Sequence, residues 1–278
     1  MTSIQDALRQ ARSFLKNTAS SSSMDAELLL AHCLKKSRHY LYTYPEFELS
    51  EQEWTMYQHD LRACSEGYPL AYVTGQRSFW SFNLSVNQAC LIPRPETELL
   101  VELSLSLLKS SSEVSLLDLG TGSGAIALAL ASECPHWQIT ATDISEAALA
   151  LAQNNADVLK AQGLRFICSD WFNAVPQQSF HAIVSNPPYL AVDDPHLQQG
   201  ALRFEPKTAL SSGPEGLDAL HTIIQQAPAF LIEGGFLLLE HGFQQKNAVQ
   251  QSLRENAYTR IQTWQDHQGH DRVTVGWR

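Results

Sequence analysis

The first part of the chain carries apolar positions at helical spacing. The earliest set recurs every three or four residues, as one face of an α-helix requires, and consists of Ile4, Leu8, Ala11 and Leu15. An apolar-rich segment at 26–34 predicts a second helix, and the serine run at 20–23 before it predicts a loop and cap. Ser50 and Glu53 have the spacing of a capping box that opens another helix. No strand pattern interrupts this region, so a small helical domain is predicted over residues 1–75.

The pattern changes at residue 76. The run from Ser78 to Val86 alternates and is rich in aromatic residues, which predicts a short β-hairpin linker within 76–93. Pro95 and Glu96 then suit the first turn of a helix that runs to about Leu108. The polar residues at 109–112 predict a joint after that helix.

From residue 114 onward, short apolar strand patterns alternate with helical patterns. Strands are predicted at 114–119, 138–142, 164–168, 181–185, 235–240, 259–263 and 272–277. Helices are predicted at 125–131, 146–159, 217–231 and 243–255. Alternation of this kind is typical of an α/β domain with a mostly parallel sheet that helices cover on both faces. We therefore expect one such domain over residues 94–278.

Composition and charge narrow the classes of protein. The 278 residues include 29 Asp and Glu against 19 Lys and Arg, a formal net charge of −10, which disfavours general binding to nucleic acid phosphates. Five cysteines are spread through the chain without a C-x-x-C pair, which is typical of free thiols in a reducing compartment. The N-terminus lacks the apolar stretch of a secretory signal, and no apolar run reaches the roughly 20 residues of a membrane span. A cytoplasmic protein without a membrane anchor is expected.

One histidine cluster near the C-terminus resembles a metal site only superficially. His267 and His270 lie close to Asp266 and Asp271. A polar turn between two strands explains this segment better than metal ligation, so no metal is predicted.

The strongest local signal is a glycine-rich segment between a strand and a helix. The apolar residues up to Leu119 lead into Gly120, Thr121, Gly122, Ser123 and Gly124. Glycines allow a tight turn and close approach of a ligand, and the following helix offers free N–H groups. Ala125 in the sixth position leaves the G-x-G-x-x-A form of a dinucleotide site possible.

Two aspartates favour S-adenosylmethionine over a nicotinamide cofactor. Asp118, two residues before the first glycine, would repel a pyrophosphate but suits a cationic amino-acid group. Asp143, at the end of the next strand, is placed to accept hydrogen bonds from both ribose hydroxyls. Asp170 and Trp171 follow the third strand, where Trp171 either stacks on an adenine or is a packing residue at the rim.

The segment Asn186-Pro187-Pro188-Tyr189 follows the fourth strand of this region. By itself it is consistent with a stiff turn, but beyond the end of a parallel strand it lies where open sheets bind ligands. An amide nitrogen is a poor nucleophile and must be held with its lone pair aimed at the methyl donor. The Asn186 oxygen and the Pro187 carbonyl would accept its two N–H groups, and Tyr189 would stack on its plane. A planar amide or amino nitrogen is therefore the predicted acceptor, with no single general base identified.

Two other functions are compatible with these residues. A DNA adenine N6-methyltransferase would use the same four residues on a flipped-out base. A non-catalytic cofactor-binding module is disfavoured because Asp143 and Asn186 are both intact.

The motifs together resemble a known family. The segments DLGTGSG, ATDIS and NPPY, in this order, resemble class I methyltransferases that act on planar nitrogens. The segments GYPLAYVTG, LIPRPETE, SNPPYL, EP-x-x-AL, EGLDAL, GGFLLLEHG and GHDRV further resemble the peptide chain release factor glutamine N5-methyltransferases, nearly from end to end. RPETE discriminates against the sister enzymes that methylate a ribosomal-protein glutamine.

This resemblance implies a fold and a reaction. The implied fold is α/β: a seven-stranded, Rossmann-like class I methyltransferase domain with a small all-α N-terminal domain for substrate recognition and a linking β-hairpin. The implied reaction moves a methyl group from S-adenosyl-L-methionine to the glutamine of the Gly-Gly-Gln loop in class 1 release factors, which modulates translation termination. A monomer is expected, with no direct nucleic acid binding.

The resemblance also assigns residues. Cofactor contacts fall on Gly120–Gly124, Asp143, Trp171 and Asn186, and substrate contacts on Asn186, Pro187, Pro188 and Tyr189, of which Asn186, Pro187 and Tyr189 would be catalytic. The roles of Asp118, Asp170 and the segment Arg94–Glu98 stay open. SSGPEGLD at 211–218 and Leu190 depart slightly from the family pattern.

Overall fold

The computed structural model describes residues 2–14, 22–108 and 113–278. Its chain divides into two compact units, one made of residues 1–76 with 198–204, the other of 77–197 with 205–278. The predicted joint at 109–112 and part of the serine run at 20–23 lie outside the described residues.

The first unit is helical. Its helices are α1 (Ile4–Phe14), α2 (Ser22–Leu34), α3 (Arg38–Thr43), α4 (Glu51–Ser65) and α5 (Leu70–Thr74). Ile4, Leu30 and Tyr57 are fully buried in its core, in keeping with the predicted apolar face. The capping box is confirmed, because Glu53 N–H donates to the Ser50 hydroxyl at 3.2 Å and Ser50 N–H donates to the Glu53 carboxylate at 2.8 Å.

The second unit begins with the hairpin β1 (Gln76–Phe79) and β2 (Phe82–Ser85). A 3₁₀ turn (Pro95–Thr97) and α6 (Glu98–Leu108) follow, as the Pro95 and Glu96 pattern predicts. The non-proline residue Trp80 in the hairpin turn has a φ of 55°.

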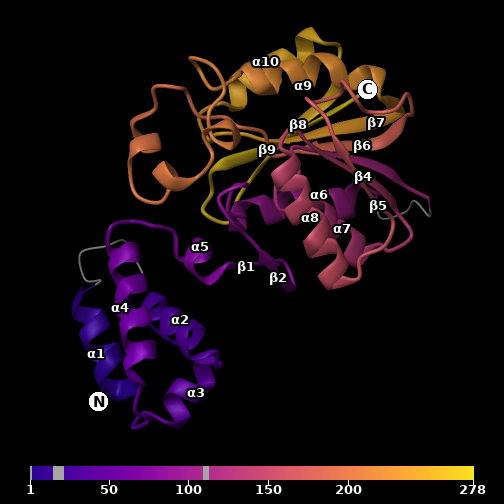
Figure 1. Ribbon diagram of the computed structural model, residues 1–278. Coiled ribbons are helices and arrows are strands. Elements are labelled where there is room, and N and C mark those ends of the chain that lie inside the picture. The colour runs from indigo at the N-terminus through magenta and orange to yellow at the C-terminus, as the bar shows by residue number, and fades with distance from the viewer. Residues whose placement is uncertain (1, 15–21, 109–112) are drawn as a thin grey trace. The chain divides into compact units, whose positions relative to one another are not determined.

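A mixed β-sheet forms the centre of the second unit (Figure 1). In the described residues it has seven strands: β3 (Ser115–Leu119), β4 (Gln138–Asp143), β5 (Leu164–Cys168), β6 (Phe180–Ser185), β7 (Leu231–Glu240), β8 (Thr259–Gln265) and β9 (Asp271–Trp277). Their order is β5-β4-β3-β6-β7-β9-β8, with β3 to β7 parallel and β9 antiparallel to both of its neighbours. The predicted α/β class is confirmed.

Helices cover both faces of this sheet. Figure 1 shows α6, α7 (Ala125–Glu133) and α8 (Glu146–Leu159) on one side and α9 (Asp218–Gln226) and α10 (Lys246–Glu255) on the other. Alternate residues of β3 divide between the two cores, Leu116 on the α6–α7 side and Leu117 on the α9–α10 side. Strands buried on both faces read as continuous apolar runs, which is why their sequence lacks a polar alternation.

Two adjacent predicted elements are wrong in extent. The sequence predicts a single helix at 217–231, whereas α9 ends at Gln226 and a 3₁₀ turn (Ala227–Ala229) follows. Pro228 has no N–H to donate to the preceding turn, so the α-helix cannot continue through it. Leu231 already belongs to β7, which therefore starts before the predicted residue 235.

The C-terminal Asp-His-Gln-Gly-His-Asp segment is the turn between β8 and β9. The Asp266 carboxylate accepts the N–H groups of Gln268 and His270 at 2.9 and 3.0 Å, which closes this turn. Within the described ranges, no helix is both long and apolar enough to cross a membrane. The same ranges contain no group of three His, Cys, Asp or Glu that could hold a metal ion.

Asn155 of α8 joins the hairpin to the glycine-rich segment. Its side-chain oxygen accepts the N–H of Ser85 at 2.8 Å. Its NH₂ group donates to the carbonyls of Ser85 and Ser123 at 3.0 and 2.9 Å. The side chain is buried, so no water can replace these bonds.

We expect Asn155→Ala to lower the free energy of unfolding by about 2 kcal/mol or more, because it leaves several backbone groups without partners. The matched control is Asn154→Ala on the exposed neighbouring position, which should change stability by less than about 0.5 kcal/mol. Urea unfolding of both variants measures the difference. Equal stabilities would contradict this role for Asn155.

Candidate functional site

A cavity of about 330 Å³ opens at the carboxyl ends of the parallel strands of the second unit. This edge is where open α/β sheets bind ligands, and the volume suits a small organic molecule. Of the residues predicted from sequence, the lining includes Gly120, Thr121, Gly122, Ser123, Asp143, Trp171, Asn186 and Pro188. Gly124, Pro187 and Tyr189 are not among the lining residues.

The glycine-rich segment turns sharply from β3 into α7. Gly122 and Gly124 have φ angles of 56° and 85°, a region that favours glycine. A Cβ on Gly124 would also lie 3.0 Å from the Leu128 side chain and 3.2 Å from Ala152. Gly124 precedes α7 without a side-chain cap, and the N–H of Ala127 in the first turn of this helix interacts with the Asp118 carboxylate.

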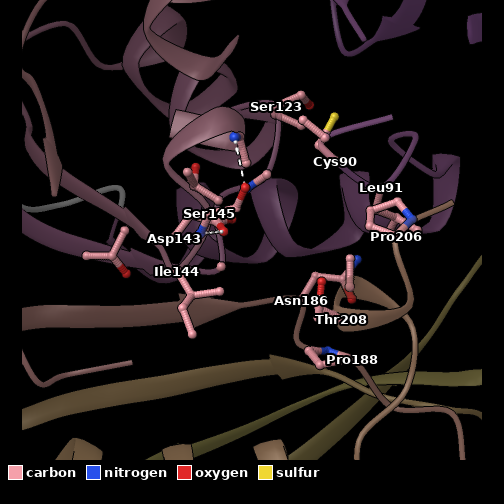
Figure 2. Close-up of a pocket in the computed structure, with 18 of the residues that line it drawn as sticks. Cys90, Leu91, Ser123, Asp143, Ile144, Ser145, Asn186, Pro188, Pro206 and Thr208 are labelled. Carbon is pink, nitrogen blue, oxygen red and sulfur yellow. Dashed lines mark hydrogen bonds between the residues drawn. The ribbon is translucent and has the colours of Figure 1, made fainter. Parts of the chain in front are cut away.

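Asp143 ends β4 and faces the cavity (Figure 2). Its two carboxylate oxygens accept the N–H groups of Gly122 and Ser145, both at 2.9 Å. Burial raises the pKa of Asp143, and these backbone hydrogen bonds oppose the rise. Each carboxylate oxygen has a further lone pair, so Asp143 retains the capacity to accept two ligand hydroxyls.

Asp118 lies beneath the glycine-rich segment rather than in the cavity lining. It is fully buried and accepts the Thr121 hydroxyl at 2.7 Å through Oδ2. Its Oδ1 makes no hydrogen bond with any described residue. Burial raises the pKa of Asp118 to about 7, despite the opposing bond from Thr121. The structure thus makes Asp118 a support of Thr121, whereas the sequence suggested contact with a cationic ligand group.

Trp171 both lines the cavity and packs on the core. Its backbone φ is 47°, and the carbonyl of this residue accepts the Ser169 hydroxyl at 2.8 Å. A Cβ on Gly120 would be 3.8 Å from its ring, so the indole lies close to the glycine-rich turn. The two roles considered from sequence, ligand contact and rim packing, are therefore compatible in one side chain. The exposed Asp170 beside it also lines the cavity.

The Asn-Pro-Pro-Tyr segment leaves β6 beside the glycine-rich turn. Ser185, the last residue of β6, donates its hydroxyl to the Leu119 carbonyl at 2.7 Å. Figure 2 shows Asn186 and Pro188 across the cavity from Asp143. Asn186 donates from Nδ2 to the Thr97 hydroxyl at 3.0 Å, while its buried Oδ1 has no partner among the described residues. An unpaired buried acceptor at a cavity wall is a place where a ligand N–H group would bind.

Tyr189 turns its hydroxyl toward β7. The hydroxyl donates to Glu240 Oε1 at 3.3 Å, and the Tyr189 carbonyl accepts from the Gln245 side chain at 2.9 Å. Burial drives the pKa of the Tyr189 phenol upward, and the nearby Glu240 reinforces that rise. Tyr189 is thereby anchored at both its backbone and its side chain. Stacking of its ring on a substrate amide stays a prediction.

The sequence did not identify several polar residues that shape the site. Glu205 is buried and accepts the Ile92 N–H at 3.0 Å and a hydrogen bond from Arg94, which lines the cavity. Thr97, which lies 89 positions before Asn186, accepts a hydrogen bond from its side chain. Glu240, at the end of β7, accepts the Thr97 hydroxyl in turn. EP-x-x-AL, RPETE and GGFLLLEHG contain Glu205, Thr97 and Glu240 respectively, but nothing in their local pattern predicts the contacts that these residues make.

Solved structures with related folds are methyltransferases. A methyltransferase from Pyrococcus furiosus aligns with a TM-score of 0.53 and 16% identity, covering 72% of this chain and 90% of that one. A T. thermophilus 16S rRNA methyltransferase solved with AdoMet and guanosine gives a TM-score of 0.52 at 18% identity, covering 73% and 49%. Residues 96–201 match the family described as "Methyltransferase small domain". The fold and the site together define an enzyme of the Rossmann-like methyltransferase class.

Sequence relatives narrow this class. Residues 6–75 match the "PrmC N-terminal domain". Proteins named release factor glutamine methyltransferase are 47% identical in Shewanella oneidensis (98% of this chain, 95% of that one) and 43% identical in Coxiella burnetii (100% of both). The relative of the same name in Escherichia coli is 45% identical over 98% of each chain. The chain belongs to the release factor glutamine methyltransferase family.

The raised pKa of Asp118 predicts a pH-dependent stability. A carboxyl group whose folded pKa exceeds its unfolded value of 3.8 stabilises the fold below that value and loses this contribution as pH rises to about 7. The stability of the native protein relative to Asp118→Asn should therefore fall by roughly 4 kcal/mol between pH 4 and pH 8. Urea unfolding across this range provides the measurement, and a difference that does not vary with pH would refute the assignment.

Proposed function

We propose that this protein transfers a methyl group from S-adenosyl-L-methionine to the side-chain N5 of the glutamine in the Gly-Gly-Gln loop of class 1 release factors. The observation that carries the proposal is the buried, unpaired Oδ1 of Asn186 at the wall of the cavity. The shared name of the relatives, at 43–47% identity over most of the chain, supports the choice of substrate.

The cavity residues fit the proposed cofactor. Asp143 has acceptor capacity for the ribose hydroxyls, and Trp171 offers an aromatic face for the adenine. The glycine-rich segment, from Gly120 to Gly124, brings backbone N–H groups close to the amino-acid part. When bound, the cofactor supplies an electrophilic methyl group on a sulfonium.

The acceptor nitrogen must be held by this chain's own residues. An amide N–H that donates to Asn186 Oδ1, with the second N–H on the Pro187 carbonyl, has its plane and its lone-pair direction fixed. Pro187 and Pro188 stiffen the backbone that carries this carbonyl. Tyr189 would lie against the amide plane. Catalysis then rests on positioning and electrostatics, with no prominent general base.

DNA adenine N6-methylation would use the same clamp but has less support. The net charge of −10 is unfavourable for a phosphate backbone. The relatives named above are protein methyltransferases, and methylation of a ribosomal-protein glutamine is the nearer alternative. We expect a monomeric cytoplasmic enzyme that acts on release factors without binding nucleic acid directly.

The decisive experiment uses radiolabelled S-adenosylmethionine and three acceptors. These are a purified release factor, the same factor with its Gly-Gly-Gln glutamine changed to alanine, and unmethylated DNA. Label in the first acceptor alone is the expected outcome, and Asn186→Ala should reduce it at least about 100-fold while the fold stays intact. Label in DNA, or in the alanine-substituted factor at the same rate, would overturn the proposal.

Asp143→Ala should weaken S-adenosylmethionine binding by about 10- to 100-fold, because both hydroxyl acceptors are lost. Asp157→Ala, on the exposed end of α8, is the matched control and should leave the dissociation constant unchanged. Isothermal titration calorimetry measures both. Unchanged affinity in Asp143→Ala would exclude the ribose contact.

A further inference from the structure

A chain of buried hydrogen bonds runs behind the Asn-Pro-Pro-Tyr segment. Thr97 donates its hydroxyl to Glu240 Oε2 at 2.8 Å and accepts Asn186 Nδ2 at 3.0 Å. Tyr189 donates to the other oxygen of Glu240 at 3.3 Å. Three elements meet here: the 3₁₀ turn before α6, the end of β6 and the end of β7. Thr97 is 4% exposed and Glu240 is 1% exposed, so water does not satisfy these groups.

When Glu240 is ionised, which its pKa places above about pH 7, the number of available hydrogens fixes the direction of every bond in this chain. An ionised carboxylate only accepts, so both oxygens of Glu240 require donors. A threonine hydroxyl has a single hydrogen, and Thr97 places it on Glu240. The lone pairs of Thr97 must then face a donor, and the NH₂ end of the Asn186 amide is that donor. The opposite end of the amide, Oδ1, is consequently left without a partner.

We infer that Thr97 and Glu240 are positioning residues for methyl transfer, because together they orient the Asn186 amide so that its oxygen accepts an N–H group of the substrate. This inference rests on the proposed function. Neither residue contacts the reacting atoms in this arrangement. Each acts through Asn186, and Glu240 acts on Tyr189 as well.

The opposite orientation of the Asn186 amide would place the wrong group toward the substrate. If Thr97 directed its hydrogen to Asn186, the amide would turn over and present NH₂ toward the cavity. Two N–H donors, from Asn186 and from the substrate amide, would then face each other without an acceptor. The acceptor nitrogen would lose the hydrogen bond that aligns its lone pair. The hydroxyl of Thr97 therefore determines whether the site recognises an amide donor.

The burial of Glu240 is difficult to explain by stability alone. Moving a carboxylate out of water is unfavourable, and burial raises the pKa of Glu240 to about 7 even though Thr97, Arg272 and Tyr189 oppose that rise. An apolar side chain of similar size would pack at this position without such a penalty. The carboxylate instead gives the two hydroxyls a defined direction.

The test compares Thr97→Val with Thr97→Ser in the full-length protein. Valine keeps the shape but removes the hydroxyl, whereas serine retains it. The matched control is Ser104→Ala, which removes another buried hydroxyl, bonded to the Leu100 carbonyl at 2.7 Å and away from Asn186. For each variant one measures kcat and KM with a release factor, the S-adenosylmethionine dissociation constant and the unfolding midpoint.

We expect Thr97→Val to lower kcat by about 10- to 100-fold, with cofactor affinity changed less than about twofold. Thr97→Ser should restore kcat to within about threefold of the native value, and Ser104→Ala should leave it unchanged. A native kcat in Thr97→Val would overturn the inference, as would parallel losses of kcat, cofactor affinity and stability. Should Thr97→Val fail to fold, Thr97→Ala replaces it, because alanine also removes the hydroxyl that accepts the Asn186 NH₂ group, and an unchanged kcat there would equally overturn the inference.

The outcomes distinguish a failure of the proposed function from a failure of the positioning role. If the native protein leaves release factor unlabelled, the substrate assignment is wrong whatever the variants do. If the native protein labels release factor and Thr97→Val does so at the same rate, only the positioning role is wrong.

Discussion

The register between β3 and its two neighbours is the constraint on which the site depends. Leu119 pairs with Thr142 of β4 and with Ser185 of β6. The three strands therefore end at one level, and the chain leaves each of them into the same space. The hydrogen bond from the Ser185 hydroxyl to the Leu119 carbonyl holds the ends of β6 and β3 together. A slip by one residue would turn Asn186 to the opposite face of the sheet and remove it from the cavity.

Around this cavity, in the part of the chain that the structure describes, two buried carboxylates accept hydrogen bonds from threonine hydroxyls. Asp118 accepts the hydroxyl of Thr121 beneath the glycine-rich turn, and Glu240 accepts that of Thr97 behind Asn186. Both carboxyl groups are fully buried, and both have a pKa raised to about 7 by burial. In each case a carboxylate that does not line the cavity orients the hydroxyl of a threonine that does. Buried polar groups of this kind contribute geometry at a cost in stability.

The sequence correctly predicted those features that depend on short, local patterns of residues. Glycines after an apolar strand, an acidic residue at the end of the next strand and Asn-Pro-Pro-Tyr after another strand all fall at the cavity edge, because parallel strands present their carboxyl ends together. Local pattern could not reveal that Thr97 and Glu240 meet across 143 positions, nor that Asn155 binds Ser85. It also overestimated the length of the helix before β7, because Pro228 ends that helix. Contacts between distant segments follow from packing, which a hydrophobic period does not encode.

The division of the chain into units has a topological consequence. The polypeptide passes from one unit to the other after residue 76, returns to the first at 198 and leaves it again after 204. Phe204 stacks its ring edge-on against Tyr68 at 5.1 Å, so the short excursion is integrated into the helical unit. A single protease cut near residue 76 would therefore not liberate an intact helical fragment, since two further covalent connections persist. The same excursion begins nine residues after Tyr189, so only residues 190–197 separate the Asn-Pro-Pro-Tyr segment from the helical unit along the backbone.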